Sequence, residues 1–144
     1  MTTFWRNWML AWCLGVGLFG LVLAGAGFAE TSGPAQALLD RMSGGALLLD
    51  RPLRFGIGLQ GALSIAIAGL AWAAIRAADA LGPDGAPIWR LLLWSMLAWF
   101  VIDSAISCAN GLWLNAVSNT VLMIALLVPL LASGVLRSAT PARV

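Results

Sequence analysis

The residues best suited to binding or proton transfer lie close together in the last third of the chain. Asp103, Ser107 and Asn110 are spaced i, i+4, i+7, so they share one face of a helix, and Asn115 and Asn119 repeat the i, i+4 spacing in the next apolar segment. A carboxylate inside a membrane helix costs roughly 2.5–3.5 kcal/mol on insertion scales, so it usually faces other helices or a water-filled cavity. These side chains could bind a polar headgroup, a small solute or a proton.

Two further polar residues extend this candidate site. Arg54 stands at the start of a preceding apolar segment, and Gln60 follows it about two turns later. If these segments are helices that begin or end on the same side, their polar groups reach similar depths. We therefore expect one polar pocket, formed by Arg54, Gln60, Asp103, Ser107, Asn115 and Asn119.

The same residues also fit a purely structural role. Asp103 would then pair with Arg54, and the asparagines would bridge neighbouring helices. Interhelical hydrogen bonds in membranes average only about 0.6 kcal/mol each, but they fix the packing. The sequence leaves both interpretations open.

Four apolar segments must position these side chains. Of the 144 residues, 61% are hydrophobic and 10% are charged, against about 25% charged in soluble domains. The segments cover residues 8–28, 55–75, 89–109 and 112–136, each near the ~20 residues that a helix needs to cross a bilayer. Lipid offers the backbone no hydrogen bonds, so these segments should be helices. We predict an all-α integral membrane four-helix bundle that forms a single transmembrane domain over residues 1–144.

The connections between the segments differ in kind. Residues 30–54 form a long loop, within which 34–42 reads as a short amphipathic helix on the membrane surface. Gly82-Pro83-Asp84-Gly85 predicts a turn, and Asn110-Gly111 predicts a tight hairpin. The first segment resembles a signal peptide, but its apolar stretch exceeds the usual 7–15 residues. We expect an uncleaved first helix.

Arginines predict the orientation of the bundle. With the N-terminus inside, five fall on the inner side and three on the outer side, so the positive-inside rule favours N-in and C-in. Five tryptophans near the inner interface fit an aromatic belt. The inner arginines are Arg6, Arg76, Arg90, Arg137 and Arg143, the outer ones are Arg41, Arg51 and Arg54, and the tryptophans are Trp5, Trp8, Trp72, Trp89 and Trp94.

The chain lacks the residues that several functional classes usually require. The chain has no histidine and only two cysteines, Cys13 and Cys108, which we expect to be small packing residues. No cofactor and no metal site are expected, nor is nucleic-acid binding, because the basic residues do not cluster. Paired carboxylates and a nucleophile beside a base are missing, which disfavours an enzyme.

The glycine and proline patterns indicate how the helices pack and bend. GxGxxG occurs at residues 15–20 and 56–61, but both copies lie inside apolar segments rather than between a strand and a helix. We interpret them as sites of close helix packing. Pro129 should kink the last helix, as a static bend or as a hinge.

The polar hairpin also carries a resemblance. WFxxDSxxS from Trp99 to Ser107, a glycine turn at Gly111, NxxxN from Asn115 to Asn119, and Pro129 in the last helix resemble a pattern in small uncharacterised four-helix proteins of the bacterial inner membrane. The resemblance covers mainly residues 54–76 and 94–131. It implies the fold, the polar hairpin and an inner-membrane location, and it brings no assigned activity.

These observations give two functional expectations. The first is a non-enzymatic accessory subunit or a module that binds a lipid or a small solute. The second is a small homodimeric transporter or channel that uses Asp103. The expected partners are the lipid bilayer and either a second copy or a larger membrane complex.

Overall fold

The chain folds into helices only. The computed structural model describes residues 1–137, which hold five α-helices, two 3-10 turns and no strand; Arg143 of the orientation argument lies outside them. The all-α prediction is confirmed. The elements are α1 (Thr3–Gly25), η1 (Ala29–Thr31), α2 (Gly33–Ser43), α3 (Arg51–Ala80), η2 (Gly82–Gly85), α4 (Ala86–Ala109) and α5 (Trp113–Ala132).

Four of these helices, α1, α3, α4 and α5, are long and apolar enough to cross a membrane, as the sequence predicts. Their ends differ from the predicted ranges, most clearly in α3, which has 30 residues. Asp50 caps α3 by accepting a hydrogen bond from Leu53 N at 2.9 Å, and Pro52 suits the first turn. These signals start the helix before its apolar stretch begins.

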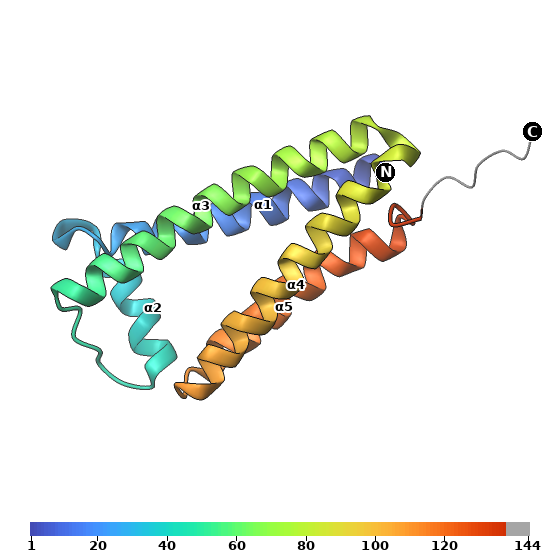
Figure 1. Cartoon of the computed structure of the whole chain (residues 1–144). Helices are drawn as coiled ribbons and strands as arrows, with labels where there is room; N and C mark the ends of the chain where they lie inside the picture. The colour runs from blue at the N-terminus through green and yellow to red at the C-terminus, as the bar shows by residue number, and fades with distance from the viewer. Residues whose placement is uncertain (138–144) are drawn as a thin grey trace, which may run out of the picture.

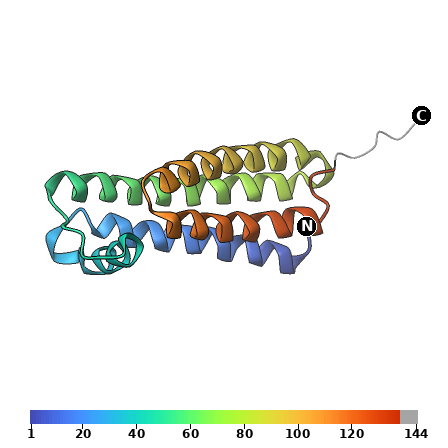
Figure 2. The ribbon, with the colours of Figure 1, turned by 90° about the horizontal axis from the view of Figure 1, so that it is seen from below.

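The long helices form two antiparallel pairs, α1 with α3 and α4 with α5. Figure 1 shows the pairs as the two arms of a V. They meet at the end that carries the start of α1, the α3–α4 connection and the end of α5, which we call the closed end (Figures 1 and 2). They diverge toward the α4–α5 connection, which we call the open end.

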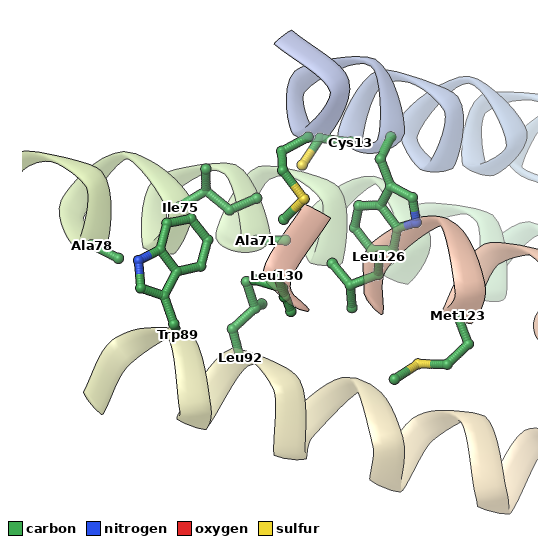
Figure 3. Close-up of a cluster of buried hydrophobic side chains, with 11 residues drawn as sticks. Cys13, Ala71, Ile75, Ala78, Trp89, Leu92, Met123, Leu126 and Leu130 are labelled. Carbon is green, nitrogen blue, oxygen red and sulfur yellow. The ribbon is translucent and has the colours of Figure 1, made fainter. Parts of the chain in front are cut away.

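The main apolar core lies at the closed end. Figure 3 shows side chains from all four long helices packed together there, including Ile75, Trp89, Leu126 and Leu130. Ile75 and Leu126 have no exposed surface, and Trp89 is 1% exposed. Burial of these large side chains fixes the vertex of the V.

Glycines hold α1 against α3. A Cβ atom on Gly61 would lie within 3.0 Å of backbone atoms of Gly20 and Ala24, and one on Gly58 would lie 3.0 Å from Gly27 Cα. The backbones therefore touch, which is how small residues join membrane helices. By contrast, Gly15 of the first GxGxxG has open space around its Cβ position.

Helix α2 lies across the open end, between α1 and the α4–α5 hairpin (Figure 1). It forms where the amphipathic segment 34–42 was predicted. The carboxylate of Asp40 accepts hydrogen bonds from Leu47 N at 2.8 Å and from Gln36 Nε2 at 2.7 Å, which ties the following loop to the helix. Ala35 is fully buried beside Leu23 and Leu49.

Candidate functional site

A hydrogen-bonded network on the α4–α5 hairpin centres on Asp103. Its Oδ1 accepts from Asn115 Nδ2 at 2.8 Å, from Asn119 Nδ2 at 2.9 Å and from Ser107 Oγ at 3.2 Å. Asn115 Nδ2 also donates to Ser107 Oγ at 2.8 Å. Asn119 is only 4% exposed, so part of the network is buried. Four of the six predicted site residues are thus in direct contact.

The hairpin geometry explains why these residues meet. Gly111 takes a positive φ of 75°, and Leu112 N donates to Ser107 O at 2.8 Å to close the turn. Positions 107 and 115 are equally far from Gly111, and so are positions 103 and 119. Equal rise along two antiparallel helices brings each pair to the same depth, with Asp103 about 9 Å from the end of α4. The i, i+4 spacing then turns both residues of each helix to one face.

The network leaves a set of oxygen acceptors unused. A carboxylate that accepts from an amide must face its NH2 group, so each asparagine directs its nitrogen toward Asp103. Within residues 1–137, the Oδ1 atoms of Asn115 and Asn119 and the Oδ2 atom of Asp103 accept no hydrogen bond. The α4–α5 network therefore offers mainly acceptors to the cavity.

These residues line a cavity between the two helix pairs. Its volume is about 410 Å³, and all four long helices contribute to its wall. Gln60 and Ser64 of α3 lie in the wall together with Asp103, Asn115 and Asn119, whereas Ser107 does not; among residues 1–137, Asp103 is the only charged residue of the lining. Sequence reasoning missed the rest of the wall, which includes Trp12, Gly15, Phe19, Trp99 and Ser118. Gly15 and Phe19 fall within the first GxGxxG and Trp99 begins the WFxxDSxxS stretch, but neither pattern indicated a cavity wall.

Arg54 lies outside this group. It stands in the first turn of α3, and its Nε donates to Leu49 O at 2.9 Å, while Nη1 is buried without a hydrogen-bond partner. No ion pair joins it to Asp103, although both residues are described. The Asp103–Arg54 pair of the structural interpretation is therefore absent, because Arg54 lies in the first turn of α3, outside the cavity wall, and is held there by Leu49 O. Asn110 also stays out, since its side chain donates to Ile106 O of its own helix at 2.8 Å.

Two tryptophans join α1 to α5 beside the cavity. Pro129 has no N–H, so the carbonyl of Ala125 loses its usual helical partner. Trp8 Nε1 donates to Ala125 O at 2.8 Å and supplies the missing hydrogen bond. One turn away, Trp12 Nε1 donates to Leu122 O at 2.9 Å. A proline in one helix and a tryptophan in another are the only sequence signal for this contact.

Other chemistry has little support in the part of the chain that the structure describes. Cys13 is buried, Cys108 is exposed, and both are free. No group of three or more His, Cys, Asp or Glu side chains within residues 1–137 is arranged to hold a metal ion. The cavity and its polar network are the best-formed candidate site.

Comparison with known proteins adds no assignment. No protein family, no curated protein and no solved structure matches this chain.

Proposed function

We propose that this chain is a multi-pass membrane protein that binds a small solute or the polar part of a lipid in the cavity between its helix pairs. The observation that supports this most is the open Oδ2 of Asp103 beside a cavity of about 410 Å³. The network keeps three acceptors unused, and a ligand can reach them, because Arg54 Nη1 is the only buried side-chain N or O atom without a partner within residues 1–137.

Binding without catalysis fits the residues of the wall best. The described residues of the lining include one carboxylate and no histidine, cysteine, lysine or arginine. A general acid–base pair or an activated nucleophile would need a second reactive group within hydrogen-bond reach. Aromatic and aliphatic walls with a few polar groups are typical of ligand sites.

The proposed location is the bacterial inner membrane, with N-in and C-in topology. The closed end then faces the cytoplasm, which agrees with the excess of arginines there. The open end faces outward, and α2 lies over it as a short helix at the membrane surface. A ligand would enter from the outer leaflet or from the outer solution.

Assembly with other chains belongs to the same proposal. The long helices expose many large apolar side chains, among them Leu18, Leu70, Trp94 and Val121. Lipid would cover most of this surface, and a second copy or another membrane subunit would cover the remainder. In this form the chain acts as an accessory subunit that presents or holds the ligand.

A cavity-filling pair of variants tests the binding function. Gly15 lines the cavity and has no heavy atom within 4 Å of its Cβ position, so Gly15→Leu fills the space without a clash at Cβ. Gly69 has equally open surroundings but is absent from the lining, so Gly69→Leu is the matched control.

Native mass spectrometry of gently extracted protein gives the readout. We expect the wild type and Gly69→Leu to carry a bound small molecule or lipid, and Gly15→Leu to lose most of it. Equal bound mass in all three proteins would contradict the proposal.

A small transporter or channel is the second candidate, because the arms of the V meet at one end and diverge at the other. In this mechanism the core at the closed end would repack as the arms rock, so that the cavity opens to alternate sides, with Asp103 as the coupling carboxylate. Flux across liposomes that Asp103→Asn abolishes and Asp84→Asn preserves would favour it. Ligand binding without flux would favour the accessory module.

A further inference from the structure

The charge of the cavity wall restricts what can bind there. In the part of the chain that the structure describes, Asp103 is the only charged lining residue, and no cationic side chain lines the cavity. Arg54 is the basic residue of α3 nearest in sequence to the lining residue Gln60, and it donates its Nε–H to Leu49 O. Asp103 accepts hydrogen bonds from neutral side chains only, so a cation beside it would be stabilised by its charge. An anionic ligand would be repelled by Asp103 and would find no cationic partner among the described lining residues, only neutral donors such as the side-chain amide of Gln60.

The hydrogen-bonding capacity of the wall restricts the ligand further. Asn115 and Asn119 give their Nδ2 groups to Asp103, so each keeps an unused Oδ1 acceptor. With Oδ2 of Asp103, the wall holds three free acceptors within one hydrogen-bonded cluster. A primary ammonium group carries three N–H donors and no acceptor, which matches this inventory.

The remaining wall suits an apolar group attached to that cation. Trp12, Phe19 and Trp99 line the same cavity, together with aliphatic side chains of α1, α3 and α5. Aromatic faces attract cations and also bury apolar chains. Polar acceptors and aromatic side chains in one wall describe an amphiphilic amine.

We propose that the ligand of this cavity carries a primary ammonium group on an apolar chain, with Asp103 as its counter-ion. The inference rests on the proposed binding function and names the chemical class of the ligand. An aminolipid headgroup and a free alkylamine share this chemistry.

Hexylammonium, hexyltrimethylammonium and hexanol are probes that separate charge from hydrogen bonding. Calorimetric titration of the wild-type protein in detergent should give the tightest binding for hexylammonium. Loss of the N–H donors or of the charge should weaken binding by about tenfold or more, as expected for hydrogen bonds to charged groups. The Gly15→Leu protein supplies the baseline for partition into micelles. This comparison needs no change at Asp103, so it holds even where a variant fails to fold.

Variants of two carboxylates locate the counter-ion. Asp103→Asn removes the charge but keeps a side chain of the same size, and it should weaken hexylammonium binding by about tenfold or more. Asp84 is exposed in η2, outside the cavity lining, so Asp84→Asn should bind as the wild type does.

Nanodiscs with equal parts of phosphatidylethanolamine and phosphatidylcholine distinguish the two sources. Enrichment of phosphatidylethanolamine on the wild type, lost in Asp103→Asn, identifies a lipid headgroup. Hexylammonium binding without this enrichment identifies a free amine. Either result supports the proposal.

Two results would overturn it, and they differ from failure of the binding function. If hexanol binds as tightly as hexylammonium and Gly15→Leu abolishes both, the cavity binds ligands but does not select an ammonium. If Gly15→Leu binds every probe as the wild type does, the cavity is no binding site and both proposals fail.

Discussion

The two helix pairs are held together by different means. In the α1–α3 pair, Gly20 and Gly61 bring the backbones into contact, and a Cβ on either would clash with the other helix. In the α4–α5 pair, Asp103 collects hydrogen bonds from Asn115 and Asn119. Lipid is as apolar as the side chains, so helices in a membrane need one of these two contacts.

This difference indicates where a ligand can act. Backbone contact between glycines uses no side-chain polar group, so the polar groups that the α1–α3 pair presents to the cavity are the side chains of Gln60 and Ser64 elsewhere on α3. The α4–α5 network keeps unused acceptors on Asp103 and on both asparagines. The α4–α5 pair therefore provides the carboxylate and its amide partners, and the α1–α3 pair provides apolar wall together with Gln60 and Ser64.

The largest expected effect is on the glycine contact. Gly61→Ala places a Cβ within 3.0 Å of Gly20 O and of backbone atoms of Ala24, none of which can move aside alone. We expect a loss of about 3 kcal/mol in the free energy of unfolding, at the upper end for overpacking. Unfolding by sodium dodecyl sulfate in mixed micelles measures this change.

Gly69→Ala is the control for that experiment. Gly69 lies in the same helix with open space at its Cβ position, so alanine should be neutral or should stabilise by about 0.5–1 kcal/mol through helix propensity. Equal effects of the two substitutions would show that the α1–α3 contact is looser than the structure has it.

The polar pair should give a smaller, coupled effect. In a double-mutant cycle, Asp103→Ala and Asn119→Ala should show a coupling energy of about 1.5 kcal/mol, near the top of the range for membrane helices. The hydrogen bond of 2.9 Å to a carboxylate is the reason. The same unfolding assay reports both single variants and the double variant.

A second cycle with Arg54→Ala sharpens this prediction. Arg54 bonds to Leu49 O and makes no ion pair with Asp103, so the two substitutions should be additive. A coupling energy between Asp103 and Arg54 as large as that between Asp103 and Asn119 would indicate an ion pair that the structure does not show.

The smallest expected effect concerns the contact between the pairs. Trp8→Phe removes the hydrogen bond to Ala125 O and should cost about 0.6 kcal/mol, the average for such bonds in membranes. In a Pro129→Ala background the carbonyl regains a backbone donor, so Trp8→Phe should then cost less. An unchanged cost in both backgrounds would mean that Trp8 acts through packing alone.

Much of the candidate site follows from local sequence rules. The depth of Asp103, Ser107, Asn115 and Asn119 depends on helix rise and on the turn at Gly111, and both are local properties. The contact between Asp103 and the asparagines could therefore be predicted. The place of Arg54 could not, because it depends on how two separate helix pairs cross.

The sequence by itself determined the helical class, the four long apolar segments and the polar faces that meet across the last hairpin. The hydrophobic length of each segment and its 3.6-residue period suffice for these features. Only the tertiary structure decided the V-shaped arrangement, the cavity lined by Trp12 and Trp99, and the bond between Trp8 and the carbonyl freed by Pro129. Crossing and rotation of helices depend on how side chains from distant segments interlock, and local periodicity carries no information about that.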